Sequence, residues 1–232
     1  MRCRPTSSHE VARAEGPRGE VLLRSREESG ATPVLELRVN GVFVMDTRET
    51  GTERALATLA LAEVDSPRRV VIGGLGLGFT LHEVLADPRV EHVAVVEIEE
   101  ALVLWMRNGT VPHGPGFLAD QRVRVVEADF ALAVAEAPRE SYDLVLLDVD
   151  NGPDQLVHTA NERLYTADLL ADVRRMLAPG GALAVWSAGR APSLLSTLGE
   201  VFDDVEERSC PVTLQERPDE YWLYLARLVS RA

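Results

Sequence analysis

The chain has 232 residues, which suits one domain with a large buried core, and it carries a formal net charge of −13. A charge of this sign repels polyphosphate backbones and argues against nucleic acid as a partner. All 24 basic residues are arginine, which excludes pyridoxal enzymes, since they need a Schiff-base lysine, and Walker-type ATPases.

The cysteines and the apolar runs exclude further classes of protein. Cys3 and Cys210 lie near opposite ends of the chain without the spacing of metal ligands, so we expect neither a disulfide framework nor a metal site. No run approaches the ~18 apolar residues of a membrane span, and the N-terminus has no apolar signal-peptide core. We therefore expect a cytoplasmic protein with no membrane partner.

The start of the chain predicts a loose tail followed by a small β unit. Residues 1–18 mix Arg, Pro, Gly and Ser without periodicity, which is typical of a tail. Within residues 19–66, two alternating apolar runs flank Asn40-Gly41, a strong signal for a hairpin with a type I′ turn. Residues 52–63 then place apolar side chains at helical spacing. We expect a β-hairpin and a linking helix.

Residues 67–232 predict one α/β domain. Short aliphatic strands alternate there with helical stretches, which is the pattern of a doubly wound, Rossmann-like parallel sheet. The expected strands are residues 70–73, 93–97, 123–127, 144–148 and 182–187. A helix over 193–202 follows, and then two strands, 205–212 and 221–228, joined by a short link that favours antiparallel pairing. The expected fold is a seven-stranded methyltransferase-type sheet whose last two strands are antiparallel.

A glycine-rich turn follows the first of these strands. Gly73, Gly74, Gly76 and Gly78 stand within six residues, with Leu75 among them. Glycines let the backbone approach a ligand, and the next helix offers free N–H donors, so we assign these five residues to cofactor binding. The pattern is G-x-G-x-G, because Phe79 stands where a dinucleotide fingerprint needs glycine. A tight turn without a ligand is the alternative.

Two acids follow the next two strands at the same edge of the sheet. Glu97 ends the second strand, where a carboxylate can accept both hydroxyls of an adenosine ribose, and Ile98 follows it. A solvated acid at the strand end is the alternative for Glu97. We interpret Glu99 as part of an exposed helix start. Asp129 follows the third strand and could accept the adenine amine, with Phe130 packed near the base. An N-cap is an equally good explanation of Asp129.

The fourth strand delivers Asp148 and Asp150 to the carboxyl edge of the sheet, and residues 151–153, Asn-Gly-Pro, then turn the chain. Such acids could orient an amine nucleophile and accept its proton during displacement at a sulfonium carbon. We assign both as catalytic. The alternative is that one of them only caps the loop.

With these motifs the sequence resembles the spermidine synthase family, within the class of S-adenosylmethionine-dependent methyltransferase folds. The resemblance covers residues 35–186 and rests on the hairpin, the Gly73-Gly74 loop, Val96-Glu97-Ile98, Ala128-Asp129, the Asp148 strand, Leu164-Tyr165-Thr166 and residues 177–181. It implies that Gly74 and Gly76 line the donor, that Glu97 holds its ribose and Asp129 its adenine, and that Asp148 lies near the transferred group. Tyr165 would face the acceptor and join the catalytic residues, and a place in the core is an equally good explanation of it.

The sequence departs from this family at two places. The family has an aspartate in the glycine loop, which grips the amine of a decarboxylated donor, where this chain has Leu75 and Leu77. It also has a Tyr-His pair where this chain reads Thr52-Glu53. The leading hypothesis is therefore an S-adenosylmethionine-dependent methyltransferase acting on a small molecule, with amines among the candidate acceptors.

Three alternatives stay open. The first is a polyamine aminopropyltransferase that uses decarboxylated S-adenosylmethionine, the second is a non-catalytic adenosyl-binding scaffold, and the third is a dehydrogenase. Trp222 and Tyr224 alternate along the last strand, and one face of that strand is a candidate homodimer contact.

Overall fold

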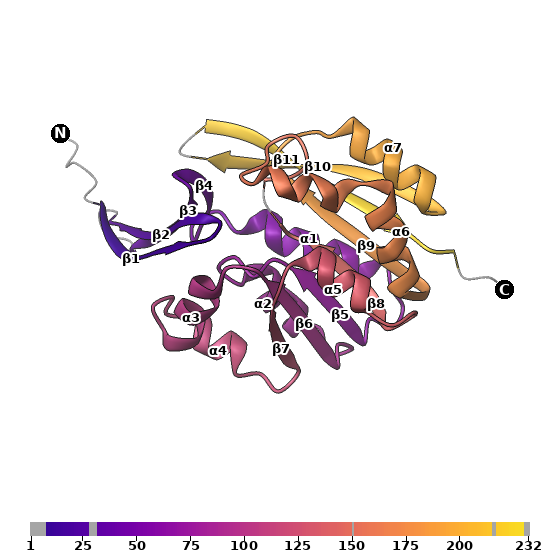
Figure 1. The fold of residues 1–232 in the computed structure, drawn as a ribbon, viewed down its shortest axis with the longest axis horizontal. Coiled ribbons are helices and arrows are strands. Elements are labelled where there is room, and N and C mark those ends of the chain that lie inside the picture. Colours follow the sequence, from indigo (N-terminus) through magenta and orange to yellow (C-terminus); the bar gives the residue numbers. More distant parts are fainter. Residues whose placement is uncertain (1–7, 28–31, 150, 215–216, 230–232) are drawn as a thin grey trace.

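The computed structural model describes residues 8–27, 32–149, 151–214 and 217–229, which form two sheets (Figure 1). The N-terminal sheet is antiparallel and has the strand order β1-β2-β3-β4. Its strands are β1 (Ser8–Gly16), β2 (Gly19–Arg26), β3 (Val34–Val39) and β4 (Val42–Asp46). The predicted hairpin is thus half of a larger unit.

The prediction of a loose tail over residues 1–18 is wrong where the structure describes it. β1 pairs with β2 along its whole length, from Ser8 opposite Arg26 to Gly16 opposite Gly19. Most β1 side chains are exposed, so the strand has no apolar alternation that a sequence could reveal. Its backbone hydrogen bonds to β2 hold it in place.

The predicted type I′ turn between β3 and β4 is confirmed. Asn40 has φ 51° and Gly41 has φ 77°, and both central residues of such a turn need positive φ. The Asn40 side chain also accepts the Glu20 amide at 2.9 Å and donates to the Arg18 carbonyl at 3.1 Å. It thereby joins the β1–β2 turn to the β3–β4 turn.

The main sheet has seven strands in the order β10-β11-β9-β8-β5-β6-β7. β9, β8, β5, β6 and β7 are parallel to one another, and β10 and β11 pair antiparallel, as predicted. β11 also runs antiparallel to β9. The strands are β5 (Arg69–Gly73), β6 (His92–Glu97), β7 (Val123–Glu127), β8 (Tyr142–Leu147), β9 (Leu177–Ser187), β10 (Asp204–Leu214) and β11 (Arg217–Arg227).

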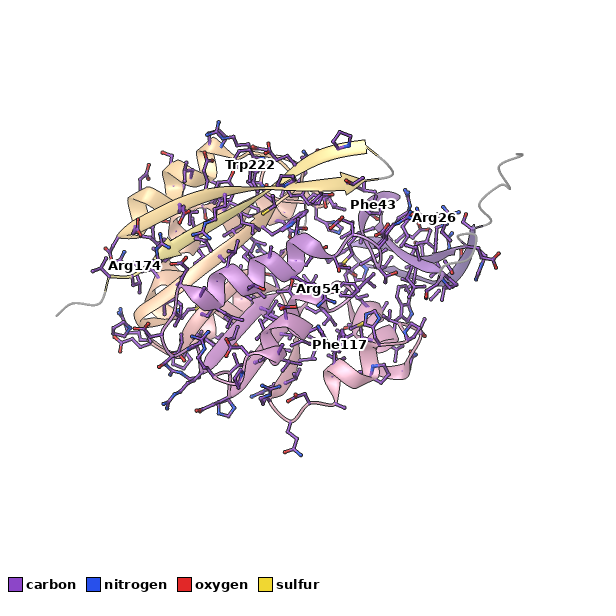
Figure 2. The ribbon with its side chains drawn as sticks, turned by 180° about the vertical axis from the view of Figure 1, so that it is seen from behind. Arg26, Phe43, Arg54, Phe117, Arg174 and Trp222 are labelled. Carbon is purple, nitrogen blue, oxygen red and sulfur yellow. The ribbon has the colours of Figure 1, made fainter. Side chains whose placement is uncertain are left out.

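Helices cover both faces of this sheet. One face packs against α1 (Gly51–Ala62), α2 (Phe79–Ala86), α3 (Glu100–Asn108) and α4 (Gly114–Leu118), and Figure 2 shows Arg54 and Phe117 on that side. The other face packs against α5 (Phe130–Glu136), the 3-10 helix η1 (Thr159–Tyr165), α6 (Ala167–Met176) and α7 (Pro192–Val201).

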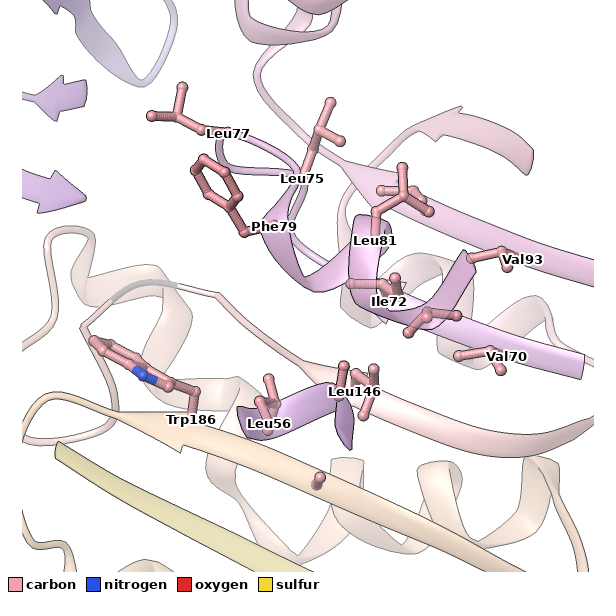
Figure 3. Packing of buried hydrophobic residues seen from close by; sticks show 14 of the residues in the cluster. Leu56, Val70, Ile72, Leu75, Leu77, Phe79, Leu81, Val93, Leu146 and Trp186 are labelled. Carbon is pink, nitrogen blue, oxygen red and sulfur yellow. The ribbon is translucent and has the colours of Figure 1, made fainter. Parts of the chain in front are cut away.

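Alternating side chains of the central strands supply these two cores. Val70 and Ile72 of β5 and Leu146 of β8 belong to one core cluster, in which Leu146 lies beside Leu56 of α1 and Ile72 beside Leu81 of α2 (Figure 3). Val71 of β5 points into the opposite core. A strand buried on both faces must be aliphatic throughout, which is why these strands could be predicted from sequence.

One of the two residues that we proposed for a dimer contact on the last strand, Tyr224, does not lie on the surface. Tyr224 is fully buried, and its hydroxyl accepts the Ala191 amide at 2.6 Å, so it belongs to the core and cannot contact a second copy. Trp222 is half-buried, with the Arg190 guanidinium 5.2 Å from its ring centre. Among the helices of the described ranges, none has the length and apolar character to cross a membrane.

Candidate functional site

A cavity of about 120 Å³ lies between the N-terminal sheet and the carboxyl ends of the central strands. The main domain contributes the predicted residues Gly74, Gly76, Glu97, Ile98, Asp129, Phe130 and Asp148. Leu37, Val39 and Val44 of the N-terminal sheet form an apolar wall. An apolar concavity with a few convergent polar groups is the usual form of a small-molecule site.

Other predicted site residues lie elsewhere. Gly73, Leu75, Gly78 and Tyr165 do not line this cavity. Asp150, predicted to be catalytic, lies outside the described residues. Tyr165 is buried, and its hydroxyl donates to the Val149 carbonyl at 3.0 Å. Tyr165 therefore holds the chain segment that follows β8, and it does not face the cavity.

The glycine turn is tightly packed against the protein itself. Gly74 has φ +92°, and a Cβ there would lie 2.0 Å from the Asp148 carbonyl oxygen. A Cβ at Gly76, which has φ +49°, would lie 2.7 Å from the Met45 sulfur. Because these residues have no side chain, the loop can pack directly on β4 and on the end of β8, and its backbone lies along the cavity.

Glu97 is buried at the end of β6 with both carboxyl oxygens engaged. Oε2 accepts the Leu75 amide and Oε1 accepts the Glu99 amide, each at 2.8 Å. Burial raises the pKa of Glu97, and these amide bonds act in the opposite direction. Since each oxygen has a second lone pair, the carboxylate can still accept hydroxyl groups from a ligand.

Asp129 is the N-cap of α5, which was one of the two explanations that the sequence allowed, and it also lines the cavity. Its Oδ1 accepts the Ala131 amide at 2.9 Å, and its Oδ2 pairs with Arg163. Phe130 is buried beside it, and a Cβ at Gly73 would come within 2.7 Å of the Phe130 ring. The aromatic ring therefore closes one side of the cavity.

Asp148 follows β8 directly and lies beside the glycine turn. Its amide donates to the Gly73 carbonyl at 2.8 Å, and its carboxyl Oδ2 accepts the Thr80 hydroxyl at 2.5 Å. Burial raises the pKa of Asp148 to about 6, against the opposing effect of the Thr80 bond. The group is therefore mostly ionised at pH 7 and can accept a proton near neutrality.

The sequence analysis missed residues at the rim of the cavity. Arg18, from the β1–β2 turn, lies with its Nε 3.3 Å from Glu99 Oε1 and donates from Nη2 to Asn161 Oδ1 at 3.3 Å. All three line the cavity. Glu99 is half-buried, which corrects its interpretation as an exposed helix start. Arg18 had no sequence signal, because it lies in the segment predicted as a tail.

Glu53 of α1 is a second missed residue. It is 7% exposed, and its Oε2 accepts the Thr52 hydroxyl at 3.0 Å. Burial, and next the charge of Asp148, raise the pKa of Glu53 to about 8. A signal was present in the sequence, since Glu53 stands three residues before Leu56, on the apolar face of the predicted helix.

Within the ranges that the structure describes, no group of three His, Cys, Asp or Glu side chains could hold a metal ion. The carboxyl groups instead surround a partly apolar cavity. Such an arrangement can hold hydroxyl groups, attract cations and accept protons.

Comparison with known proteins places this site in a family. Residues 49–192, more than half of the chain, match the model of the spermine/spermidine synthase domain. Polyamine aminopropyltransferase 2 of Bacillus cereus is 30% identical over 207 residues, which cover 82% of this chain and 55% of that protein. Putrescine N-methyltransferase 2 of Nicotiana tabacum is 32% identical over 127 residues, covering 54% and 34%. The chain spans about half the length of these curated relatives, or less.

Solved structures agree on the fold. A crystal structure of spermidine synthase in complex with the transition-state analogue AdoDATO has a TM-score of 0.81 at 17% identity. The alignment covers 94% of this chain and 73% of that one. The match of the family model to more than half of the sequence shows that the chain belongs to the spermine/spermidine synthase family.

Proposed function

We propose that this protein is an aminopropyltransferase, which transfers the aminopropyl group of decarboxylated S-adenosylmethionine to a small amine. Relatives named polyamine aminopropyltransferase support this activity over the methyltransferase that the sequence analysis put first. The observation that carries the proposal is Asp148, a half-buried residue on the cavity wall whose carboxyl pKa of about 6 suits a base at neutral pH.

The residues of the cavity fit the adenosyl part of the donor. Glu97, fixed by two backbone amides, would accept the ribose hydroxyls. Asp129 would accept the adenine amine, and Phe130 with the apolar wall of the N-terminal sheet would enclose the base. The backbone of Gly74 and Gly76 would lie along the donor.

The donor supplies a carbon bound to a positively charged sulfonium, which is open to displacement. Asp148 would accept the proton that an acceptor ammonium must lose before its nitrogen attacks. The nitrogen lone pair then forms the new C–N bond, the C–S bond breaks, and its electrons neutralise the sulfonium to a thioether. Asp148 also holds the nucleophile in line with the carbon, which lowers the entropic part of the barrier.

The choice of donor tests this proposal. Purified protein is incubated with putrescine and either decarboxylated S-adenosylmethionine or S-adenosylmethionine, and the products are identified by mass spectrometry. We expect an aminopropylated amine and methylthioadenosine with the decarboxylated donor alone. Absence of transfer from either donor would contradict an enzymatic function and leave the adenosyl-binding scaffold as the explanation.

Methyl transfer to an amine is the second candidate. It is favoured by the uncharged Leu75 and Leu77 in the glycine turn, and by relatives named putrescine N-methyltransferase. In the same experiment it would give a methylated amine with S-adenosylmethionine. The cytoplasmic location and the homodimer stay predictions from the sequence.

A further inference from the structure

Glu53 is a buried carboxyl group for which the mechanism above has no use. It lies in the first turn of α1 and is 7% exposed. The Thr80 hydroxyl, which donates to Asp148 Oδ2 at 2.5 Å, lies 3.4 Å from the Glu53 backbone carbonyl. This contact places Glu53 close to Asp148, which lines the cavity.

The charged groups that act on Glu53 are acids. Asp148 at the end of β8 and Glu49 before α1 both raise its pKa. On β11, the pKa of Tyr221 is raised by burial and in part by the charge of Glu53. The neighbouring Arg54 is engaged away from the site, since its Nη1 donates to Glu83 at 3.0 Å and lies 2.9 Å from His82 Nδ1.

Glu53 is buried and Asp148 is half-buried, and two carboxyl groups so close and so little hydrated are unfavourable when both are ionised. The pKa of Glu53 is raised to about 8 and that of Asp148 to about 6. Near neutral pH, the ligand-free protein therefore holds a proton on Glu53 while Asp148 is mostly ionised. A positively charged group of a ligand bound beside Glu53 would stabilise the ionised carboxylate, and Glu53 would then lose that proton.

An aromatic pair next to these acids points to a ligand as well. Trp186, at the end of β9, lies next to Leu56, about one helical turn on from Glu53 (Figure 3). The Trp186 ring meets Tyr221 edge-on, with centroids 4.8 Å apart. Trp186 is 5% exposed, and among the described residues its Nε1 has no hydrogen-bond partner. Aromatic rings beside carboxylates favour the methylenes and the ammonium group of an alkylamine.

We propose that Glu53, together with Asp148, receives the primary ammonium group of a substrate and thereby determines specificity, an inference that rests on the aminopropyl transfer proposed above. Both the donor's aminopropyl arm and a diamine acceptor carry such a group. The uncharged side chains of Leu75 and Leu77, both buried in the glycine turn, leave this role to α1.

Ammonium binding at Glu53 should release a proton. The positive charge favours the ionised carboxylate, so the proton held by free Glu53 near pH 7 leaves when the ligand binds. We expect the release to approach about one proton per ammonium bound. An adenosyl thioether without an amine should release none from this group.

Titration calorimetry at pH 7, in buffers with different ionisation enthalpies, measures both affinity and proton release. The ligands are methylthioadenosine, decarboxylated S-adenosylmethionine, and putrescine added to protein saturated with methylthioadenosine. The variants are Glu53→Gln and the control Glu83→Gln, which removes an acid that pairs with Arg54 on the neighbouring helix.

We expect Glu53→Gln to bind methylthioadenosine like the wild type. It should lose affinity for one ammonium ligand by on the order of tenfold to a hundredfold and lose the coupled proton release. The ligand that is affected, donor or diamine, identifies which ammonium group Glu53 receives. The control should match the wild type in every titration.

Three results would overturn the inference while leaving the proposed function intact. The first is unchanged binding of both ammonium ligands to Glu53→Gln, and the second is an equal loss of affinity for methylthioadenosine in that variant. The third needs only the wild type, and so holds even where the variant does not fold: ammonium ligands that bind without releasing a proton. Failure of the wild type to bind methylthioadenosine would reject the proposed function itself, and the inference with it.

Discussion

Asp148 and Glu53 are neighbouring acids whose surroundings give them different protonation at neutral pH. Burial raises the pKa of both, to about 8 for Glu53 and about 6 for Asp148, and the charges of Asp148 and Glu49 raise the pKa of Glu53 further. When two neighbouring carboxyl groups differ in pKa in this way, one can act as a base while the other pairs with a charged group.

The role of Asp148 as base predicts a specific pH profile. In the wild type, kcat/KM should rise with pH through about 6 as Asp148 ionises, and again through about 8 as Glu53 does, because the ammonium group binds the ionised form of Glu53. Asp148→Asn should lower turnover by on the order of 10²–10⁴-fold and lose the rise near pH 6, while methylthioadenosine still binds. Asp172→Asn, which changes a half-exposed acid of α6 paired with Arg175, is the control and should behave like the wild type.

Burial of Glu53 predicts a pH-dependent stability. Between pH 4.5 and 8 the folded state holds a proton that the unfolded state releases, so the free energy of unfolding falls as pH rises. Glu53→Gln removes this dependence. Without ligand, the variant should be the more stable protein at pH 8, by on the order of a few kcal/mol, with the gain shrinking towards pH 4.5. Urea unfolding at several pH values measures it, and a gain independent of pH would contradict the assignment.

At this scale, sequence reasoning found the residues that follow strands. Glu97 and Asp148 could be placed because the carboxyl ends of parallel strands meet at one edge. Arg18 lines the cavity from the β1–β2 turn, and Glu53 of α1 lies behind Asp148, outside the cavity lining. Their positions depend on how separate elements pack, and no spacing along the chain encodes that packing.

Among the elements, the glycine turn allows the sharpest test. Gly74→Ala places a Cβ 2.0 Å from the Asp148 carbonyl, at φ +92°. We expect a loss of stability on the order of 2 kcal/mol or more, together with weaker methylthioadenosine binding. Gly199→Ala in α7 is the matched control, since nothing lies within 4 Å of its added carbon. It should stabilise the protein by about 0.5–1 kcal/mol. Thermal unfolding and calorimetry separate the two outcomes.

The two sheets differ in how well the sequence predicted them. The main-sheet strands β5 and β8 are aliphatic because both faces are buried, and this pattern is visible in the sequence. β1 has almost no buried face, so backbone pairing with β2 defines it. A strand can be predicted from its side-chain pattern only where burial of those side chains stabilises the strand.

For the whole molecule, the cavity is formed by two sheets that share no strand. Arg18 connects them at the rim through Glu99 and Asn161. Arg18→Ala should speed methylthioadenosine dissociation and raise amide hydrogen exchange in β1 and β2, because a partly buried ion pair is lost. Arg24→Ala, which removes only a bond to the Ser8 hydroxyl, should change neither. Equal exchange in both variants would contradict a role for Arg18 in closing the cavity.

We expect Met45 at the end of β4 to make the protein sensitive to oxidants. Its sulfur accepts the Leu77 amide at 3.2 Å and lies where Gly76 leaves no room for even a methyl carbon. A sulfoxide would add an oxygen at this point and push the glycine turn out of place. Peroxide should therefore abolish nucleoside binding, and the loss of binding should parallel the extent of Met45 oxidation, which mass spectrometry measures. Met45→Leu should resist this loss, and a bound thioether nucleoside should slow it in the wild type.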